Sequence, residues 1–119
     1  MLEWLRGGEP ARSRVAEVLA SERPLMSWIN LGEVAYVLQR RAGERRAREV
    51  VATLRGALSL ELPSAERVLE AAAIKAAHAV SYADAFAVAT SLKHDAVLLT
   101  GDLEILAANP AWKIEDLRP

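Results

Sequence analysis

Short apolar runs that alternate with helical patterns are the feature of this sequence that most limits its fold. Two of these runs, LMSWI at 25–29 and AVLL at 96–99, are bounded by proline, asparagine or polar turn residues. Their length and continuous apolar character are typical of strands covered on both faces. Residues 58–62 and 112–115 complete four expected strands. Strands separated by helices predict an α/β fold with a mainly parallel sheet and helices on both faces.

Amphipathic patterns, proline and glycine place the helices between these strands. We expect helices at 11–22, 31–42, 44–57, 64–78 and 81–94, a short one after 102, and the end of another at 1–6. Gly43 separates the second and third, which therefore form an αα-hairpin. A length of 119 residues without a linker or repeat predicts one domain over 1–119.

Composition excludes several classes of protein and site. No apolar stretch approaches the about 20 residues of a membrane span, and residues 1–10 lack the design of a signal peptide, so we expect a soluble cytoplasmic protein. The chain has no cysteine and two histidines, which leaves carboxylates as its metal ligands. Its six glycines form neither a dinucleotide fingerprint nor a phosphate loop, and no serine-hydrolase motif is present.

Arginines gather in one segment although the formal net charge is only −1. The segment 40–48, RRAGERRAR, contains one glutamate and five arginines: Arg40, Arg41, Arg45, Arg46 and Arg48. Such a run is most often the solvated face of a helix. It is also able to contact a phosphate backbone, so these arginines are candidate nucleic-acid-binding residues.

Three acids lie at expected helix starts: Glu33, Asp84 and Asp102. Each has a plain structural explanation, because Asn30 and Ser81 would cap helices with an acid three residues later, and Asp102 would itself be a cap. Their joint placement favours a site instead. Glu33 and Asp102 follow strands, where open α/β sheets bind ligands. Carboxylates that share a cleft repel each other unless a cation is present, and oxygen ligands favour Mg²⁺ or Mn²⁺, so all three acids are candidate metal ligands and catalytic residues.

The segments SWINLGEVAYVLQRR, SYADAFAVATSLKHDAVLLTGD and IEDLRP resemble the PIN-domain ribonucleases, most of all the VapC toxins of toxin-antitoxin pairs. The most specific part is the order and spacing of A-D-A at 83–85 and T-G-D at 100–102. The resemblance implies a three-layer α/β/α fold and cleavage of RNA phosphodiester bonds by a metal-activated water. It matches Glu33, Asp84 and Asp102 to the family's second, third and fourth acids, and Thr100 to a supporting hydroxyl beside the last.

The family pattern normally begins with a central strand that reads V-x-D-T/S, and this sequence lacks that strand and its acid. The absence predicts either direct pairing of the strands at 25–29 and 96–99 or a gap with unpaired backbone groups. Two explanations stand open. The natural chain begins upstream of Met1, which we favour, or the protein is a degenerate member with weaker metal binding.

The leading functional hypothesis is a Mg²⁺-dependent endoribonuclease toxin, a homodimer held inactive by a cognate antitoxin. The resemblance implies that this partner packs across the hairpin at 31–57 and inserts a basic residue into the acidic cleft. A noncatalytic PIN-like binding or assembly module is the alternative, and a nuclease that cuts DNA is a weaker one.

The remaining aromatic and titratable candidates have structural interpretations. The tryptophans are scattered away from the arginines, which favours packing over base stacking for Trp4, Trp28 and Trp112. His78 and His94 are expected at helix ends and Asp95 in a turn, none of them catalytic.

Overall fold

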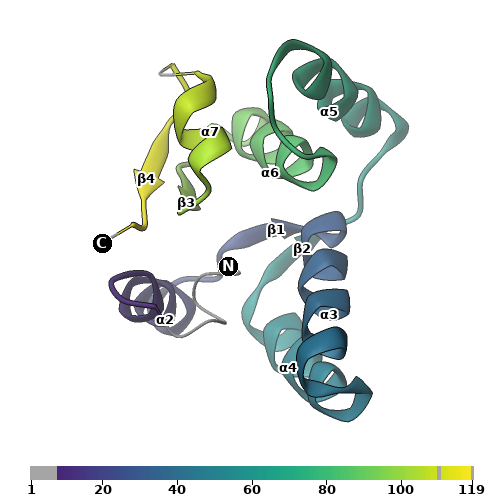
Figure 1. Ribbon diagram of the computed structural model, residues 1–119, viewed down its shortest axis with the longest axis vertical. Coiled ribbons are helices and arrows are strands. Elements are labelled where there is room, and N and C mark those ends of the chain that lie inside the picture. Colours follow the sequence, from purple (N-terminus) through teal and green to yellow (C-terminus); the bar gives the residue numbers. More distant parts are fainter. Residues whose placement is uncertain (1–7, 110, 119) are drawn as a thin grey trace.

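The computed structural model describes residues 8–109 and 111–118, so the expected helix end at 1–6 and Trp4 lie outside the described residues. In chain order the elements are α2 (Ala11–Ser21), β1 (Leu25–Ser27), α3 (Trp28–Ala42), α4 (Glu44–Ala57), β2 (Ser59–Glu61), α5 (Ala65–Ala77), α6 (Tyr82–Lys93), β3 (Leu98–Thr100), α7 (Leu103–Ala108) and β4 (Ile114–Asp116). The alternation of strands and helices confirms the expected α/β class (Figure 1).

Side-chain caps set where several helices begin. Ser64 and Ser81 each accept a hydrogen bond from a backbone N–H in the first turn of α5 and α6, and Asp102 does the same for α7. The predicted cap at Asn30 is wrong, because Ser27 caps α3 and the helix begins at Trp28, three residues earlier than expected. The strand predicted at 25–29 is correspondingly shorter and ends at Ser27. Glu33 therefore lies in the second turn of α3, where it has no capping role.

The four strands form two separate parallel pairs. Leu25 to Ser27 pair with Ser59 to Glu61, and Leu98 to Thr100 pair with Ile114 to Asp116. Among the described residues no ladder joins β1 to β3, and Figure 1 shows the two pairs apart from each other. The mainly parallel arrangement is confirmed. Direct pairing of β1 with β3, one of the two arrangements considered for a chain without the family's first strand, is therefore absent from the described part of the chain.

Two helices connect the strand pairs. Helix α6 packs against both β1 and β3. Helix α2 contributes Val15 to a cluster with Leu117 and Leu99, and its Leu19 also packs against the core around Leu31 and Leu54. Burial of these apolar side chains holds the two halves of the molecule together in the absence of sheet hydrogen bonds.

A buried ion-pair network joins β2, α5 and α6. The Arg67 side chain is only 7% exposed, and its guanidinium pairs with Glu61 and Glu70 and donates to Thr90 Oγ1 at 3.2 Å. His94 Nε2 lies 2.5 Å from the second oxygen of Glu61. His94 is the C-terminal cap residue of α6 and His78 that of α5, as expected. Paired and hydrogen-bonded in this way, the buried charge is satisfied.

Helices α3 and α4 form the predicted αα-hairpin. Gly43 separates them with φ of 87°, in the left-handed region that glycine adopts without a Cβ penalty. The hairpin extends away from the strands, and the five arginines lie toward its far end (Figure 1). No described helix is both long enough and apolar enough to cross a membrane.

Candidate active site

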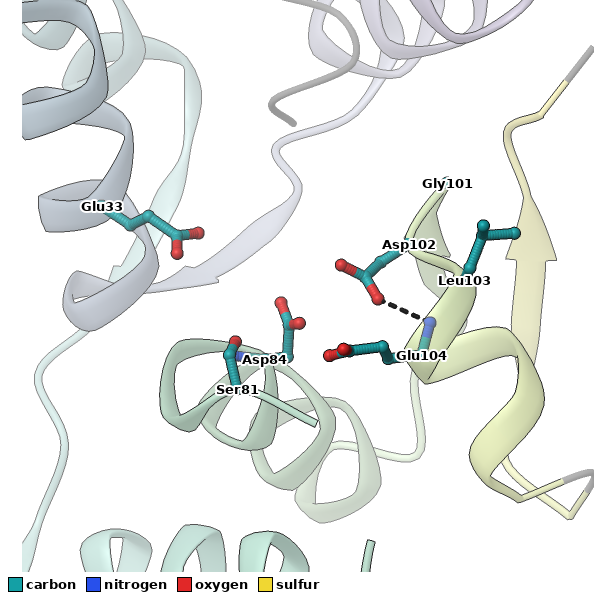
Figure 2. A pocket seen from close by; sticks show the side chains of 7 residues that line it. All are labelled: Glu33, Ser81, Asp84, Gly101, Asp102, Leu103 and Glu104. Carbon is teal, nitrogen blue, oxygen red and sulfur yellow. Dashed lines mark hydrogen bonds between the residues drawn. The ribbon is translucent and has the colours of Figure 1, made fainter. Parts of the chain in front are cut away.

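The three acids singled out from the sequence meet in one pocket at the carboxyl ends of β1 and β3. Its volume is about 480 Å³, and its lining consists of Glu33, Ser81, Asp84, Gly101, Asp102, Leu103 and Glu104. Figure 2 shows Glu33 reaching in from α3, Asp84 from α6, and Asp102 and Glu104 from the start of α7. The expectation that separate helix starts bring these carboxylates together holds in the structure.

Asp84 stands in the first turn of α6, which Ser81 and Asn30 hold in place. Ser81 Oγ accepts a hydrogen bond from Asp84 N at 3.1 Å, which is the N-terminal half of the capping interaction read from the sequence. Asn30 Nδ2 donates to Ala83 O at 2.8 Å and so ties α3 to the same turn. Because the backbone bonds satisfy the turn, the Asp84 carboxylate is left to point into the pocket (Figure 2).

Asp102 has a structural and a site role together. Its Oδ1 accepts hydrogen bonds from Glu104 N at 2.9 Å and Ile105 N at 3.2 Å, so it caps α7 as the sequence indicated. The buried Thr100 Oγ1 accepts from Asp102 N at 3.0 Å, which fixes the turn between β3 and α7. Capping uses one carboxylate oxygen and leaves the second available to the pocket.

Glu104 is a site residue that the sequence analysis missed. Ligand atoms of Asp84, Asp102 and Glu104 all lie within 4.8 Å of one another, and Glu33 lies outside this close group. The signal was present in the spacing T-G-D-L-E, because residues two apart in the first turn of a short helix are both able to turn toward one end of it. The T-G-D motif alone ends at Asp102 and does not include Glu104.

Mutual repulsion and burial make the carboxylates hard to ionise together. Burial, and next the charge of Asp102, raises the pKa of Asp84 to about 6, although a hydrogen bond from Ser81 partly offsets the rise. Burial and the same Asp102 charge also raise the pKa of Glu33. A group of acids with raised pKa values in a cleft is typical of a functional site.

The donor set fits a divalent cation with a preference for oxygen ligands. No lysine, arginine or histidine lines the pocket among the residues that the structure describes, so no side-chain cation offsets the repulsion. Asp84, Asp102 and Glu104 would hold such an ion, and Glu33 faces them from across the pocket (Figure 2). Carboxylate oxygens of this kind suit Mg²⁺ or Mn²⁺.

The arginine segment lies on the hairpin and outside this pocket. Three of its members are paired, Arg48 with Glu44 and both Arg45 and Arg46 with Glu49, so the two carboxylates offset part of the positive charge of α4 locally. Arg40 stacks on the ring of Tyr36 at 5.2 Å. Arg40 and Arg41 have no carboxylate partner among the described ion pairs, which leaves these two as the stronger candidates for an external phosphate.

The residues given structural interpretations have the contacts those interpretations require. The Trp112 ring meets His78 edge-on at 4.8 Å, and Trp28 lies under Arg55. Asp95 occupies a turn with φ of 49° and pairs with Lys113. None of these residues lines the acidic pocket.

Solved structures with a similar fold come from several bacteria. The VapBC2 complex of Rickettsia felis, bound to a promoter DNA fragment, contains a chain with a TM-score of 0.72 and 12% identity, over 98% of this chain and 91% of that one. DNA-bound VapBC from Salmonella typhimurium contains a chain with a TM-score of 0.73 and 19% identity, with the same coverage of both chains. VapC20 from Mycobacterium tuberculosis is a toxin that cleaves the sarcin-ricin loop. Its TM-score is 0.66 and its identity 23%, over 89% of this chain and 88% of that one.

At these identities the structural likeness speaks for the fold alone. A comparison with curated proteins gave no match. The family comparison is more specific, since the PIN domain model matches residues 1–109, nearly the whole chain, and spans all the acids of the pocket. With the α/β architecture and the structural neighbours, this match shows that the chain belongs to the PIN domain family.

Proposed function

We propose that this protein is a metal-dependent endoribonuclease of the toxin type, acting in the cytoplasm through the acidic pocket. The observation that carries the proposal is the convergence of Glu33, Asp84, Asp102 and Glu104 in a pocket without an offsetting side-chain cation among the described residues. Membership of the PIN family and the likeness to VapC20, a toxin that cleaves the sarcin-ricin loop, support RNA as the substrate class.

Each acid has a distinct part in the proposed site. Asp84, Asp102 and Glu104 would hold Mg²⁺ or Mn²⁺, which supplies positive charge for the phosphodiester oxygens and lowers the pKa of water. Glu33 faces this group from α3 at a greater separation and is placed to accept a proton from the attacking water (Figure 2). Its raised pKa brings it nearer the range in which a carboxylate works as a general base.

Helix α3 connects the pocket to Arg40 and Arg41, which have no carboxylate partner in the described part of the chain. Arg40 lies seven residues beyond Glu33, which puts it on the same face of the helix about 10 Å further along the axis. Tyr36 lies between them on this face, half exposed, and stacks with Arg40. An RNA strand whose scissile phosphate lies at the acids is therefore able to place a neighbouring phosphate at Arg40 or Arg41.

The partner proposed for this toxin is a cognate antitoxin that covers the α3–α4 hairpin and places a basic side chain among the acids. The neighbours that are VapBC complexes support a partner of this kind. A basic residue would lower the repulsion among the carboxylates as a metal does, and so would compete with it. We further propose that the toxin itself is a homodimer.

Cleavage of RNA by the purified protein should require Mg²⁺ or Mn²⁺, stop on addition of EDTA and fall at least tenfold in the Glu33→Gln variant. Gel analysis of total RNA and of short single-stranded oligonucleotides measures it. Glu66→Gln is the matched control, because Glu66 is an exposed acid in the first turn of α5 that does not line the pocket.

Two results would overturn this assignment. Cleavage that persists in EDTA would show that no metal is needed, and equal rates for Glu33→Gln and Glu66→Gln would show that Glu33 has no part in the chemistry. Binding of RNA or a small protein without any cleavage would favour the noncatalytic module.

Replacing both Arg40 and Arg41 with glutamine should weaken RNA binding and make it less dependent on salt. Loss of two phosphate contacts lowers the slope of log affinity against log salt by about 1.4 for a single strand. Fluorescence anisotropy of a labelled oligonucleotide between 50 and 300 mM salt, in EDTA to prevent cleavage, gives this slope. Arg46→Gln is the control, since its guanidinium already pairs with Glu49. An unchanged slope in the double variant would show that Arg40 and Arg41 do not contact RNA phosphates.

A further inference from the structure

The outer face of α3 carries an exposed aromatic side chain beside the acidic pocket. Tyr36 is 50% exposed, and it lies three residues after Glu33, which lines the pocket. Residues three apart on a helix are neighbours on its surface, with about 5–6 Å between their Cβ atoms. An exposed aromatic ring at this distance from the acids offers a surface on which a nucleic-acid base is able to stack.

Arg40 holds the Tyr36 ring from one side. Its guanidinium carbon lies over the ring, 5.2 Å from the ring centroid. This cation–π contact restricts the ring and places a positive charge next to it. Because the guanidinium covers one face of the ring, the opposite face is the one that a ligand is able to reach.

Gly32 leaves open space next to the ring. Aromatic side chains on helices lean toward the N-terminus, so the Tyr36 ring lies over the preceding turn of α3, which contains Gly32. A Cβ added at Gly32 would meet no atom within 4 Å, so the ring itself does not fill this space. Glycine is the least favourable residue in a helix after proline, and helix formation therefore does not explain its presence here.

Ile29 bounds the same space on its far side. Its side chain is 38% exposed and lies seven residues before Tyr36, so the two share a side of the helix and are about 10 Å apart along its axis. Stacked bases are about 3.4 Å apart, so a base held between two groups needs about 7 Å between their centres. The spacing of Ile29 and Tyr36 therefore admits one planar base above Gly32.

We propose that Ile29, Gly32 and Tyr36 bind one unpaired base of single-stranded RNA, in a nucleotide next to the phosphate that is cut at the acids. The proposal rests on the proposed ribonuclease function and specifies its substrate. Bases in duplex RNA are stacked on each other, whereas a single strand or a loop is able to turn one base outward onto an aromatic side chain. Arg40 and Arg41, further along the same helix, offer positive charge to the phosphates of such a strand.

Fluorescence anisotropy of a fluorescein-labelled twelve-nucleotide oligouridine, in EDTA to prevent cleavage, tests this base site. Every register of the strand offers the same base, so the natural RNA target need not be known. Tyr36→Ala removes the stacking ring, Gly32→Leu fills the space beside it, and each should weaken binding at least fivefold. Tyr36→Phe keeps the ring and should bind within twofold of the unaltered protein.

Gly56→Leu is the matched control for Gly32→Leu. Gly56 is a helical glycine of α4 where an added Cβ would also meet no atom within 4 Å, and it does not line the acidic pocket. Leucine favours a helix more than glycine does, so both variants should fold, and Gly56→Leu should bind oligouridine like the unaltered protein. A twelve-nucleotide abasic strand, which has the same backbone and no bases, should bind Tyr36→Ala, Gly32→Leu and the unaltered protein equally.

Three results would overturn the base site. They are equal oligouridine affinity in Gly32→Leu and Gly56→Leu, a loss of abasic-strand binding as large as the loss of oligouridine binding, and unchanged affinity in Tyr36→Ala, which would assign the exposed ring to a protein partner instead. None of these results bears on metal-dependent cleavage or on its test with Glu33→Gln. A protein that binds no RNA at all would contradict the ribonuclease proposal together with this site.

Discussion

Replacing Asp84 with asparagine should reduce RNA cleavage at least a hundredfold and, in the metal-free protein, raise stability. The two effects have one cause. Asp84 is the acid whose pKa is raised to about 6, mainly by burial and the neighbouring Asp102 charge. Ionising it at neutral pH therefore costs folding free energy that only a bound cation offsets. Asparagine keeps the size of the side chain and removes both the repulsion and the negative charge needed to hold a metal.

The sign of the stability effect follows from linkage. The pKa of Asp84 is about 6 in the folded protein and near 3.8 in the unfolded chain, so the folded state binds the proton more tightly between these values. Stability is then lost as pH rises from about 4 to 6. With allowance for solvent screening at this half-buried site, the loss is about 1–2 kcal/mol, which Asp84→Asn should recover at pH 7.

Urea unfolding in EDTA at pH 5 and pH 7.5 measures this stability, and initial rates in Mg²⁺ measure cleavage. The matched control is Asp95→Asn, whose acid lies in an exposed turn beside Lys113. A variant at Asp84 that is less stable than the unaltered protein in EDTA at pH 7.5 would contradict the electrostatic account. One that retains full activity would contradict its role in the site.

Replacing Arg67 with methionine should destabilise the protein by about 2–4 kcal/mol without changing the acidic pocket. Removing one member of a buried ion pair leaves its partner without an opposite charge, and Arg67 is the cation for both Glu61 and Glu70. Its contact with Thr90 also ties α5 to α6, the helix that carries Asp84. Methionine fills much of the same volume, so the loss reflects charge and hydrogen bonding rather than a cavity.

Equilibrium urea unfolding at pH 7 measures the effect, and Arg46→Met provides the control, since exposed helix pairs contribute less than about 0.5 kcal/mol.

A hydrogen bond with His94 is the largest cause that lowers the pKa of Glu61, and Arg67 adds to it. The stability from this lowered pKa is present above the normal range of a glutamate and lost as pH falls through the folded value. Equal midpoints for the two variants would show that the network is dispensable.

The fold class and the acids at helix starts were predictable because both depend on local pattern. Apolar runs of strand length between amphipathic helices indicated the alternating elements, and an acid after a parallel strand falls at the edge where such sheets gather ligands. Asp84 and Asp102 lie where that reasoning placed them. The predicted cap of α6 by Ser81 and the predicted cap of α7 by Asp102 are both confirmed, and the role of Asp102 in catalysis stays a prediction.

Boundaries at the start of α3 were wrong for a physical reason. Trp28 and Ile29 extend an apolar run that began in the strand, and a short apolar run does not distinguish a strand from the first turn of a helix. Ser27 caps α3, so the helix begins at Trp28. Ile29 then lies in the first turn of the helix, and its side chain is exposed. The shift moves Glu33 out of any capping box, so its place in the pocket has no competing structural explanation.

Side-chain direction and long-range pairing were beyond local pattern. Glu104 joins Asp84 and Asp102 because α7 begins at the edge of the pocket; the spacing T-G-D-L-E permits this arrangement, but it does not show which way the Glu104 side chain turns. The separation of β1 from β3 depends on how α2 and α6 hold the two strand pairs, and the sequence left both direct pairing and a gap open.

Titration with Mn²⁺ tests most directly whether the acidic pocket is a metal site, because it requires no knowledge of the RNA target. Electron paramagnetic resonance of free Mn²⁺ gives the bound fraction for the unaltered protein, Asp84→Asn and the Asp95→Asn control. We predict saturable binding that tightens as pH rises from 5 to 7, as Asp84 loses its proton, and that is at least tenfold weaker in Asp84→Asn alone. Equal Mn²⁺ affinity in the unaltered protein and Asp84→Asn at pH 7 would contradict the assignment of the acidic pocket as a metal site.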